Sequence, residues 1–189
     1  MLPVKPPADL DVQIFPYCKV DGVRTFKDSF IFGLYDRMVK DHVAEDFFYD
    51  DLIPTRDEWL RAMQHPMNFL YVIFANRALA GIGLLNEVKD KSASIHFTSF
   101  RSWLSSRQRA TVAREVLGKL IKIKSNKNTK ECLFDVFVGK IMKSNHRALW
   151  FARKMGFSTA GEIPSAAWNS KKGHSEPLVL TYFLRENLK

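Results

Sequence analysis

Between residues 69 and 184 the apolar residues change their spacing in a fixed order that few folds accommodate. Three strand-like runs come first, FLYVIFA at 69–75, ALAGIGLLNEV at 78–88 and SASIHFTSF at 92–100. An amphipathic helix follows. Ser105 and Gln108 suit a capping box at its start, and Val112, Val116 and Leu120 lie on one face. ECLFDVFVG at 131–139, a second helix and PLVLTYFL at 177–184 complete the order. The first of these helices is expected to be a crossover between parallel strands.

The segment before residue 69 adds a strand and two helices. VQIFPYCKV at 12–20 is strand-like and runs into Asp21-Gly22, a dipeptide that suits a hairpin turn. One helix is expected from about Asp28, and a second after Thr55, which forms a capping box with Glu58. We therefore predict one layered α/β (α+β) domain at residues 10–189, after a Pro-rich lead-in at 1–9. Its central sheet would be mixed and mostly antiparallel, flanked by about four helices.

Charge is distributed unevenly along the chain. The formal net charge is +9 and the pI is about 9.6. Residues 101–154 hold 14 Lys and Arg against three acids, whereas residues 36–58 hold eight acids against three basic residues. The basic segment indicates an anionic partner, and the acidic segment would favour a cationic one.

Composition argues against several classes of protein. The two cysteines are too few for a disulfide framework or a metal knuckle, so we predict no metal site and favour the cytoplasm. The longest apolar runs fall far short of the roughly 20 residues that span a bilayer, so no membrane segment is expected. Nothing in the sequence decides between a monomer and a homodimer.

The stretch NHRALWFARKMGF, residues 145–157, combines a helix start, an apolar stripe and a helix stop. Ser144 or Asn145 suits the N-terminal cap, and Gly156 suits the left-handed residue that ends many helices. Phe157 can then pack back over the last turn. A capped amphipathic helix followed by a strand accounts for the whole pattern.

The same stretch resembles a motif of the GNAT superfamily of acetyltransferases, Asn-x-x-Ala-x-x-x-Tyr-x-Lys-x-Gly-Phe. Asn145, Ala148, Lys154, Gly156 and Phe157 are in register, and the element order is similar over about residues 10–185. The resemblance implies direct transfer of an acyl group, usually acetyl, from coenzyme A to an amine. It also implies that two parallel strands, at 92–100 and 131–139, splay apart to receive acetyl-CoA or another acyl-CoA.

The resemblance also implies a pyrophosphate site at the start of the helix after the first splayed strand, where amide groups and helix dipole favour an anion. The family's loop, Arg or Gln-x-x-Gly-x-Gly or Ala, aligns with residues 108–113, and Thr111 replaces its first Gly. The Thr111 hydroxyl, with Arg107 and Arg109, is expected to compensate by contacting phosphate. The alternative is that these arginines are an ordinary solvated helix face. The implied cofactor-binding residues are Phe97, Thr98, Phe100, Arg107, Gln108, Arg109, Ala110, Thr111, Val112, Ala113, Asn145, Ala148, Phe151 and Lys154.

The residues expected to move protons differ from the family pattern. The Tyr that protonates the leaving thiolate in many members is Ala152 here, and loss of a general acid typically costs roughly 10² to 10⁴ in rate. Tyr182, Ser144 and His146 are candidate substitutes. For the base we consider His96, whose unperturbed pKa lies near neutral pH, with Glu87 as the alternative. A His in a strand is also commonly just a satisfied polar residue.

The acceptor and two rival functions remain open at this point. The resemblance assigns the acceptor site largely to the first two helices, whose acids would favour a cationic amine. Trp168, in a stretch expected to be a loop at 165–176, would line that site or cover the sheet edge. The rivals are a basic nucleic-acid-binding protein, and an acetyltransferase-like fold kept as a weakly active or inactive binding or assembly module.

Overall fold

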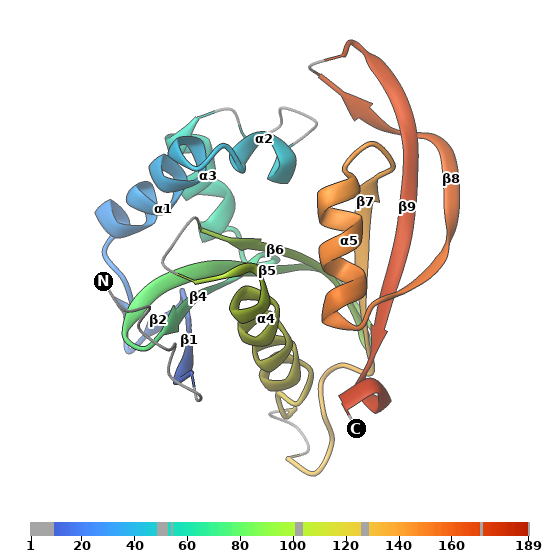
Figure 1. Cartoon of the computed structure of the whole chain (residues 1–189). Coiled ribbons are helices and arrows are strands. Elements are labelled where there is room, and N and C mark those ends of the chain that lie inside the picture. The colour runs from blue at the N-terminus through green and yellow to red at the C-terminus, as the bar shows by residue number, and fades with distance from the viewer. Residues whose placement is uncertain are drawn as a thin grey trace, which may run out of the picture.

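The structure is a computed structural model, and it describes residues 10–48, 53, 55–100, 104–125, 129–170 and 172–188. The predicted lead-in at 1–9 lies outside these residues. A seven-stranded sheet runs through the molecule in the order β1-β4-β5-β6-β7-β9-β8, and every neighbouring pair is antiparallel except β6 and β7 (Figure 1). The strands are β1 (Val12–Pro16), β4 (Phe69–Ala75), β5 (Ala78–Lys89), β6 (Ser92–Ser99), β7 (Val136–Met142), β8 (Ser158–Asn169) and β9 (His174–Leu184). The predicted mixed sheet with one parallel pair is confirmed.

Helices cover both faces of this sheet and create two cores. The helices are α1 (Asp28–Lys40), α2 (Ala44–Phe47), α3 (Arg56–Gln64), α4 (Ser106–Ile121) and α5 (His146–Met155), with a 3₁₀ turn at Arg185–Leu188. One core packs α4 and α5 against the sheet, with Leu117 and Phe137 fully buried. The other packs α1–α3 on the opposite face, around Trp59. Alternate residues of β4 supply the two cores, Ile73 and Ala75 the first and Leu70 and Val72 the second, as the two-residue period of a strand requires.

The predicted helix starts are confirmed by their caps. Thr55 and Glu58 form the expected capping box at α3, and Ser105 and Gln108 form one at α4. Asn145 caps α5 by accepting the Ala148 amide at 2.9 Å. Gly156 ends that helix with φ +100°, a left-handed conformation that glycine adopts without strain. No helix among the described residues is long and apolar enough to cross a membrane.

Three segments differ from the prediction. The first strand ends at Pro16, and residues 19–24 form a separate small hairpin, β2 (Lys19–Val20) with β3 (Val23–Arg24), around the expected Asp21-Gly22 turn. Within the described residues 131–135, Cys132 alone forms a strand bridge, an isolated one with Lys124. The strand β7 therefore begins at residue 136 rather than 131. The expected loop at 165–176 lies mostly in β8 and β9, which form a long hairpin. Nearly all of β8 is exposed, so it lacks the apolar alternation that marks a strand.

Candidate active site

The parallel strands β6 and β7 are paired over only three residues and then separate. Their ladder joins Ser92 to Val136, Ala93 to Phe137 and Ser94 to Val138. Beyond it, β6 continues to Ser99 and β7 to Met142 without pairing with each other. The predicted splay is therefore present, with its second strand at Val136–Met142. Past Ser94 and Val138 the edges of β6 and β7 face each other without forming a ladder. A ligand that carries amide groups can therefore hydrogen bond to these edges.

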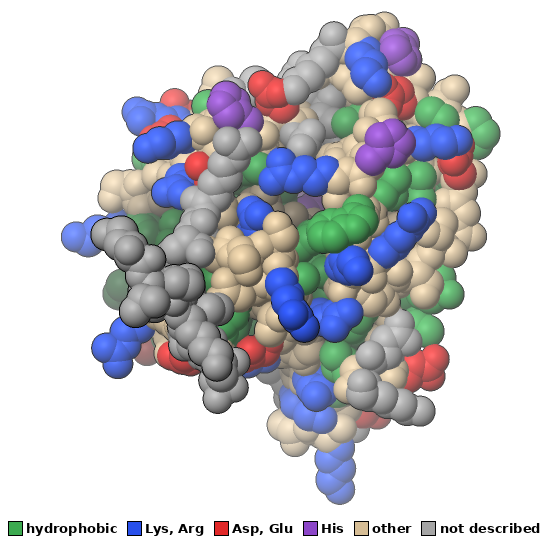
Figure 2. All heavy atoms as spheres, viewed as in Figure 1, with side chains coloured by type: hydrophobic (Ala, Val, Ile, Leu, Met, Phe, Trp, Pro, Cys, Tyr) green, Lys and Arg blue, Asp and Glu red, His purple; other side chains and the backbone are tan. Residues whose placement is uncertain are grey.

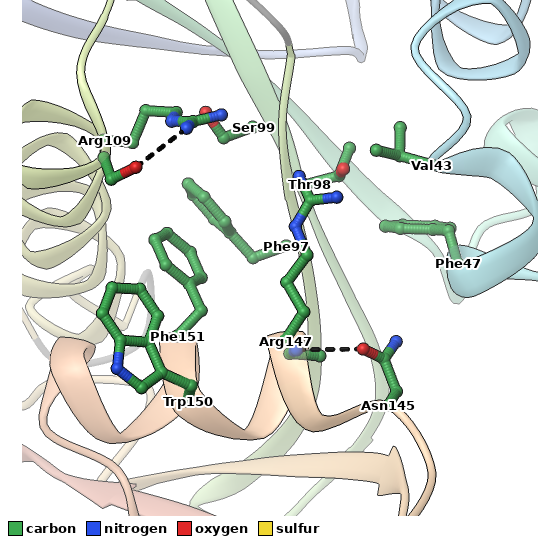
Figure 3. A pocket seen from close by; sticks show the side chains of 12 residues that line it. Val43, Phe47, Phe97, Thr98, Ser99, Arg109, Asn145, Arg147, Trp150 and Phe151 are labelled. Carbon is green, nitrogen blue, oxygen red and sulfur yellow. Dashed lines mark hydrogen bonds between the residues drawn. The ribbon is translucent and has the colours of Figure 1, made fainter.

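Two adjoining cavities lie at this opening. The larger, which we call the α4–α5 cavity, has a volume of about 190 Å³. It lies between the end of β6 and the first turns of α4 and α5 (Figure 3). The smaller, the β6–β7 cavity, has a volume of about 110 Å³ and includes His96 and Lys140. Residues that line both cavities are Phe47, Phe97, Asn145, Ala148 and Phe151.

Positive charge gathers at the α4–α5 cavity. Arg109 extends from the first turn of α4, where its Nη2 donates to Ser106 Oγ at 3.2 Å, and Arg147 extends from the first turn of α5 (Figure 3). The N-terminal ends of two helices therefore meet here, and each adds a partial positive charge. Figure 2 shows Lys and Arg side chains around a hydrophobic patch on this face of the molecule. The arrangement suits an elongated anion that also carries an apolar part.

Six of the fourteen predicted cofactor residues line the α4–α5 cavity: Phe97, Thr98, Arg109, Asn145, Ala148 and Phe151. The other eight line neither cavity: Phe100, Arg107, Gln108, Ala110, Thr111, Val112, Ala113 and Lys154.

Local contacts explain several of these placements. Phe100, Val112 and Ala113 are buried in the cores, and Gln108 is used in the capping box. The Thr111 hydroxyl donates to the Arg107 carbonyl within α4, at 3.2 Å.

The candidate bases lie together where the strands separate. The Glu87 carboxylate accepts a hydrogen bond from Ser94 Oγ at 2.6 Å and another from Lys140 Nζ. These two bonds, with Lys140 the stronger influence, hold the pKa of Glu87 below its usual range, so the group is ionised at neutral pH. His96 lines the β6–β7 cavity, and its ring lies 5.6 Å from that of Phe47.

None of the three candidate proton donors lines either cavity. Tyr182 is opposite Val138 in the β7–β9 ladder and lines neither cavity, whereas its neighbour Thr181 lines the β6–β7 cavity. Since side chains alternate along a strand, the two point to opposite faces. Ser144 hydrogen bonds with Glu176 in the β8–β9 hairpin. His146 is exposed at the start of α5 and lines neither cavity.

Sequence reasoning missed several residues of the two cavities. Arg147 and Trp150 occupy variable positions of the motif that begins at Asn145, and both line the α4–α5 cavity. Their places in the first two turns of a capped helix are the signal that would have found them. Phe47 lies in the four-residue helix α2, which is too short to show a period. Lys140 follows the predicted end of its strand, so only the true bounds of β7 reveal it.

Comparison with solved structures defines the fold. The chain resembles a Salmonella typhimurium acetyltransferase that modifies the N-terminal serine of ribosomal protein L7/L12, with a TM-score of 0.67 and 15% identity over 92% of this chain and 94% of that one. It also resembles a Vibrio cholerae spermidine N-acetyltransferase solved with CoA and spermine, with a TM-score of 0.60 and 14% identity over 93% and 98% of the two chains. A microcin C7 self-immunity acetyltransferase solved with acetyl-CoA and AMP gives 0.61 and 14% over 83% and 86%. The chain therefore has the GNAT acetyltransferase fold.

Sequence comparison adds nothing to this result. No family model matches the chain, and no curated protein matches it. At 14–15% identity these structural neighbours show the fold of this chain and not its chemistry.

Proposed function

We propose that the chain is an acyl-CoA-dependent N-acyltransferase that transfers an acyl group, first of all acetyl, directly to an amine. One observation carries the proposal: the first turns of α4 and α5, with Arg109 and Arg147, border a cavity lined by the end of the splayed strand β6, next to the cavity that β6 and β7 both line. Guanidinium groups and helix N-termini suit a pyrophosphate. The edges of β6 and β7 that do not pair with each other suit the amide groups of a pantetheine arm. Structural neighbours solved with CoA or acetyl-CoA support this assignment.

In this proposal each wall of the α4–α5 cavity has a role. Arg109 and Arg147 bind the pyrophosphate, and the backbone of Phe97, which is directed away from β5, faces the pantetheine amides. Phe151, which packs against Phe97 with ring centroids 6.0 Å apart, supplies an apolar wall for the arm. Arg114 has another role, because its Nε donates to the Lys154 carbonyl at 2.8 Å and joins α4 to the end of α5.

The transfer itself needs a base close to the splay. The acceptor nitrogen attacks the thioester carbonyl carbon, the new C–N bond forms, and the C–S bond breaks to release the CoA thiolate. Glu87 takes the proton lost by the nitrogen, directly or through water, and His96 is the alternative base. Glu87 is favoured because its carboxylate is fixed by two hydrogen bonds beside the splay, although it lines neither cavity and His96 lines the β6–β7 cavity.

Among the residues that the structure describes, the leaving thiolate has no obvious proton donor in the two cavities. Because Ala152 cannot donate a proton, the thiolate leaves unprotonated and takes its proton from solvent, which is feasible because alkyl thiols are fairly acidic, with a pKa of about 8.5 for that of cysteine. Tyr182 and Ser144 remain alternative donors, although neither lines a cavity. Without a general acid at residue 152 we expect a modest turnover rate. The same absence is the reason to consider the rival function, a binding module without catalysis.

The acceptor is proposed to be an amine that enters on the α1–α3 side. The acids of residues 36–58 would favour a cationic acceptor, but some of those that the structure describes have structural partners. Asp41 is buried and pairs with Arg37 at 2.9 Å, and Glu58 serves the α3 cap.

The experiment is calorimetric titration of acetyl-CoA into the wild type and into Arg109→Glu and Arg147→Glu. We expect micromolar binding by the wild type and a loss of about tenfold or more in each variant, because each reversal places a carboxylate beside the pyrophosphate. Thiol release with a panel of amines then measures turnover.

Arg153→Glu is the matched control, since Arg153 is an exposed arginine of α5 that lines neither cavity. An equal loss in that variant would mean that only overall charge matters, as for nucleic acid. Absence of binding by the wild type would contradict the cofactor assignment. Binding without turnover on any amine would favour the inactive module.

A further inference from the structure

An ion pair crosses the sheet where β6 and β7 separate. Glu87 belongs to β5 and Lys140 to β7, so their contact passes over the intervening strand β6, where Ser94 also donates to the carboxylate. Glu87 has φ +48° and lies where the β5–β6 register shifts, between Asn86 and Lys89. A bulge of this kind turns a side chain away from its regular direction. Here it brings Glu87 to a lysine 53 residues away.

The pair is at the edge of the proposed reaction site. Lys140 is two residues beyond Val138, the last residue of the β6–β7 ladder, and lines the β6–β7 cavity with His96. The side chains of Lys140 and Glu87 are 33% and 57% exposed, so a small solute can reach both. At this exposure water screens the pair, and exchanging one partner for another costs little.

Charge balance restricts what can make that exchange. An acceptor ammonium that binds Glu87 displaces Lys140 and leaves the lysine ammonium without its carboxylate. A polyamine would also bring further positive charge beside Lys140, which is unfavourable. An acceptor with its own carboxylate next to the amine replaces both partners, since its ammonium contacts Glu87 and its carboxylate contacts Lys140.

We infer that Lys140 makes the site selective for amines that carry a neighbouring carboxylate, such as free amino acids. This inference rests on the proposed function and narrows it. Glu87 takes one proton from the acceptor ammonium, and the second proton that the nitrogen loses on transfer reaches the departing CoA thiolate through water. The new C–N bond forms as the C–S bond breaks, and the products are an N-acetyl amino acid and the CoA thiol. Lys140 binds the carboxylate and takes no part in the bond changes.

The experiment compares L-amino acids with the matching L-amino-acid amides, and with spermidine, as acceptors of acetyl-CoA. Each acid and its amide share the side chain and differ in the carboxylate, which also raises the pKa of the neighbouring amine, so kcat/KM is compared per concentration of free amine. We expect kcat/KM for the acid to exceed that for its amide by about tenfold, as for one charge-assisted contact that is partly exposed. Lys140→Met should bring the ratio close to one, and Lys140→Arg should restore it.

Lys143→Met is the control, because Lys143 pairs with Glu162 at 3.0 Å and lines neither cavity. It removes the same charge and should keep the wild-type ratio. Since the ratio is taken within each variant, a folding defect affects both acceptors and cancels. Equal or better use of amides or spermidine by the wild type would overturn the inference while the proposed acyltransfer stands. Failure to bind acetyl-CoA or to acylate any amine would overturn both.

Discussion

At Gly81 the backbones of β5 and β6 lie so close together that there is no room for a side chain. A Cβ atom on Gly81 of β5 would lie 2.3 Å from the Thr98 carbonyl oxygen of β6. Thr98 and Ser99 line the α4–α5 cavity, so the absence of a side chain at residue 81 helps to set the position of one cavity wall.

We expect Gly81→Ala to destabilise the protein by roughly 1–3 kcal/mol, as overpacking does, and to weaken acetyl-CoA binding because β6 must shift. Thermal denaturation and calorimetric titration measure the two effects. Gly161→Ala in β8 is the control, since no atom lies within 4 Å of a Cβ at that position. A stable Gly81→Ala variant with unchanged affinity would show that β6 yields without cost.

Single residues of the site could be predicted only in part. Arg109, Asn145 and Phe151 were predicted because they stand in or near short motifs whose spacing is local. The pair of Glu87 and Lys140 was beyond prediction, because it depends on a bulge in one strand and the true register of another.

Among the elements, the β8–β9 hairpin contains an unusual buried charge. The Glu176 side chain is only 7% exposed and accepts hydrogen bonds from Lys172, Ser144 and Asn169. These bonds, that of Lys172 first, lower the pKa of Glu176 from 4.5 to about 2. Ser144 directly precedes Asn145, the cap of α5, so the carboxylate links the hairpin to the start of that helix.

A carboxyl group whose pKa is lower in the folded state stabilises that state at pH values above its unfolded pKa. The wild type should therefore be more stable than Glu176→Gln above pH 4.5, and the difference should shrink as the pH falls from 4.5 towards 2. Thermal melts of both proteins across this range provide the measurement. Glu162→Gln removes an exposed, singly paired carboxylate of the same hairpin and should show a smaller effect. A pH-independent difference would contradict the role assigned to the charge.

Elements differ in how far local sequence defines them. α3, α4 and α5 were predicted with their starts because capping residues and a 3.6-residue period are local signals. β8 was not predicted over its second half, because its exposed residues have no alternation and its pairing is imposed by β9. α2 has only four residues and leaves no periodic trace.

At the scale of the whole molecule, only three residue pairs join β6 to β7 and thereby the two parts of the sheet. The strands β1, β4, β5 and β6 form one part, and β7, β9 and β8 form the other. Acetyl-CoA is proposed to lie between these parts and to replace the missing ladder.

Hydrogen exchange tests this arrangement. With saturating acetyl-CoA, the amides of residues 95–99 and 139–142 that face the splay should exchange at least about fivefold more slowly, which corresponds to one net hydrogen bond of about 1 kcal/mol. Amides of the β1–β4 ladder, at the far edge of the sheet, are the internal control. Protection spread evenly over the chain would indicate general stabilisation rather than contact at the splay.

The two outer strands of the sheet each contain a proline, Pro16 in β1 and Pro164 in β8. Proline has no N–H to offer a neighbouring strand, and around Pro164 the β8 register shifts and Ser165 takes φ +53°. An incoming strand therefore meets an interrupted row of donors on either side. Although the sheet has seven strands and two edge strands, it is a poor template for growth into fibrils. Concentrated solutions of the protein should therefore resist this form of aggregation.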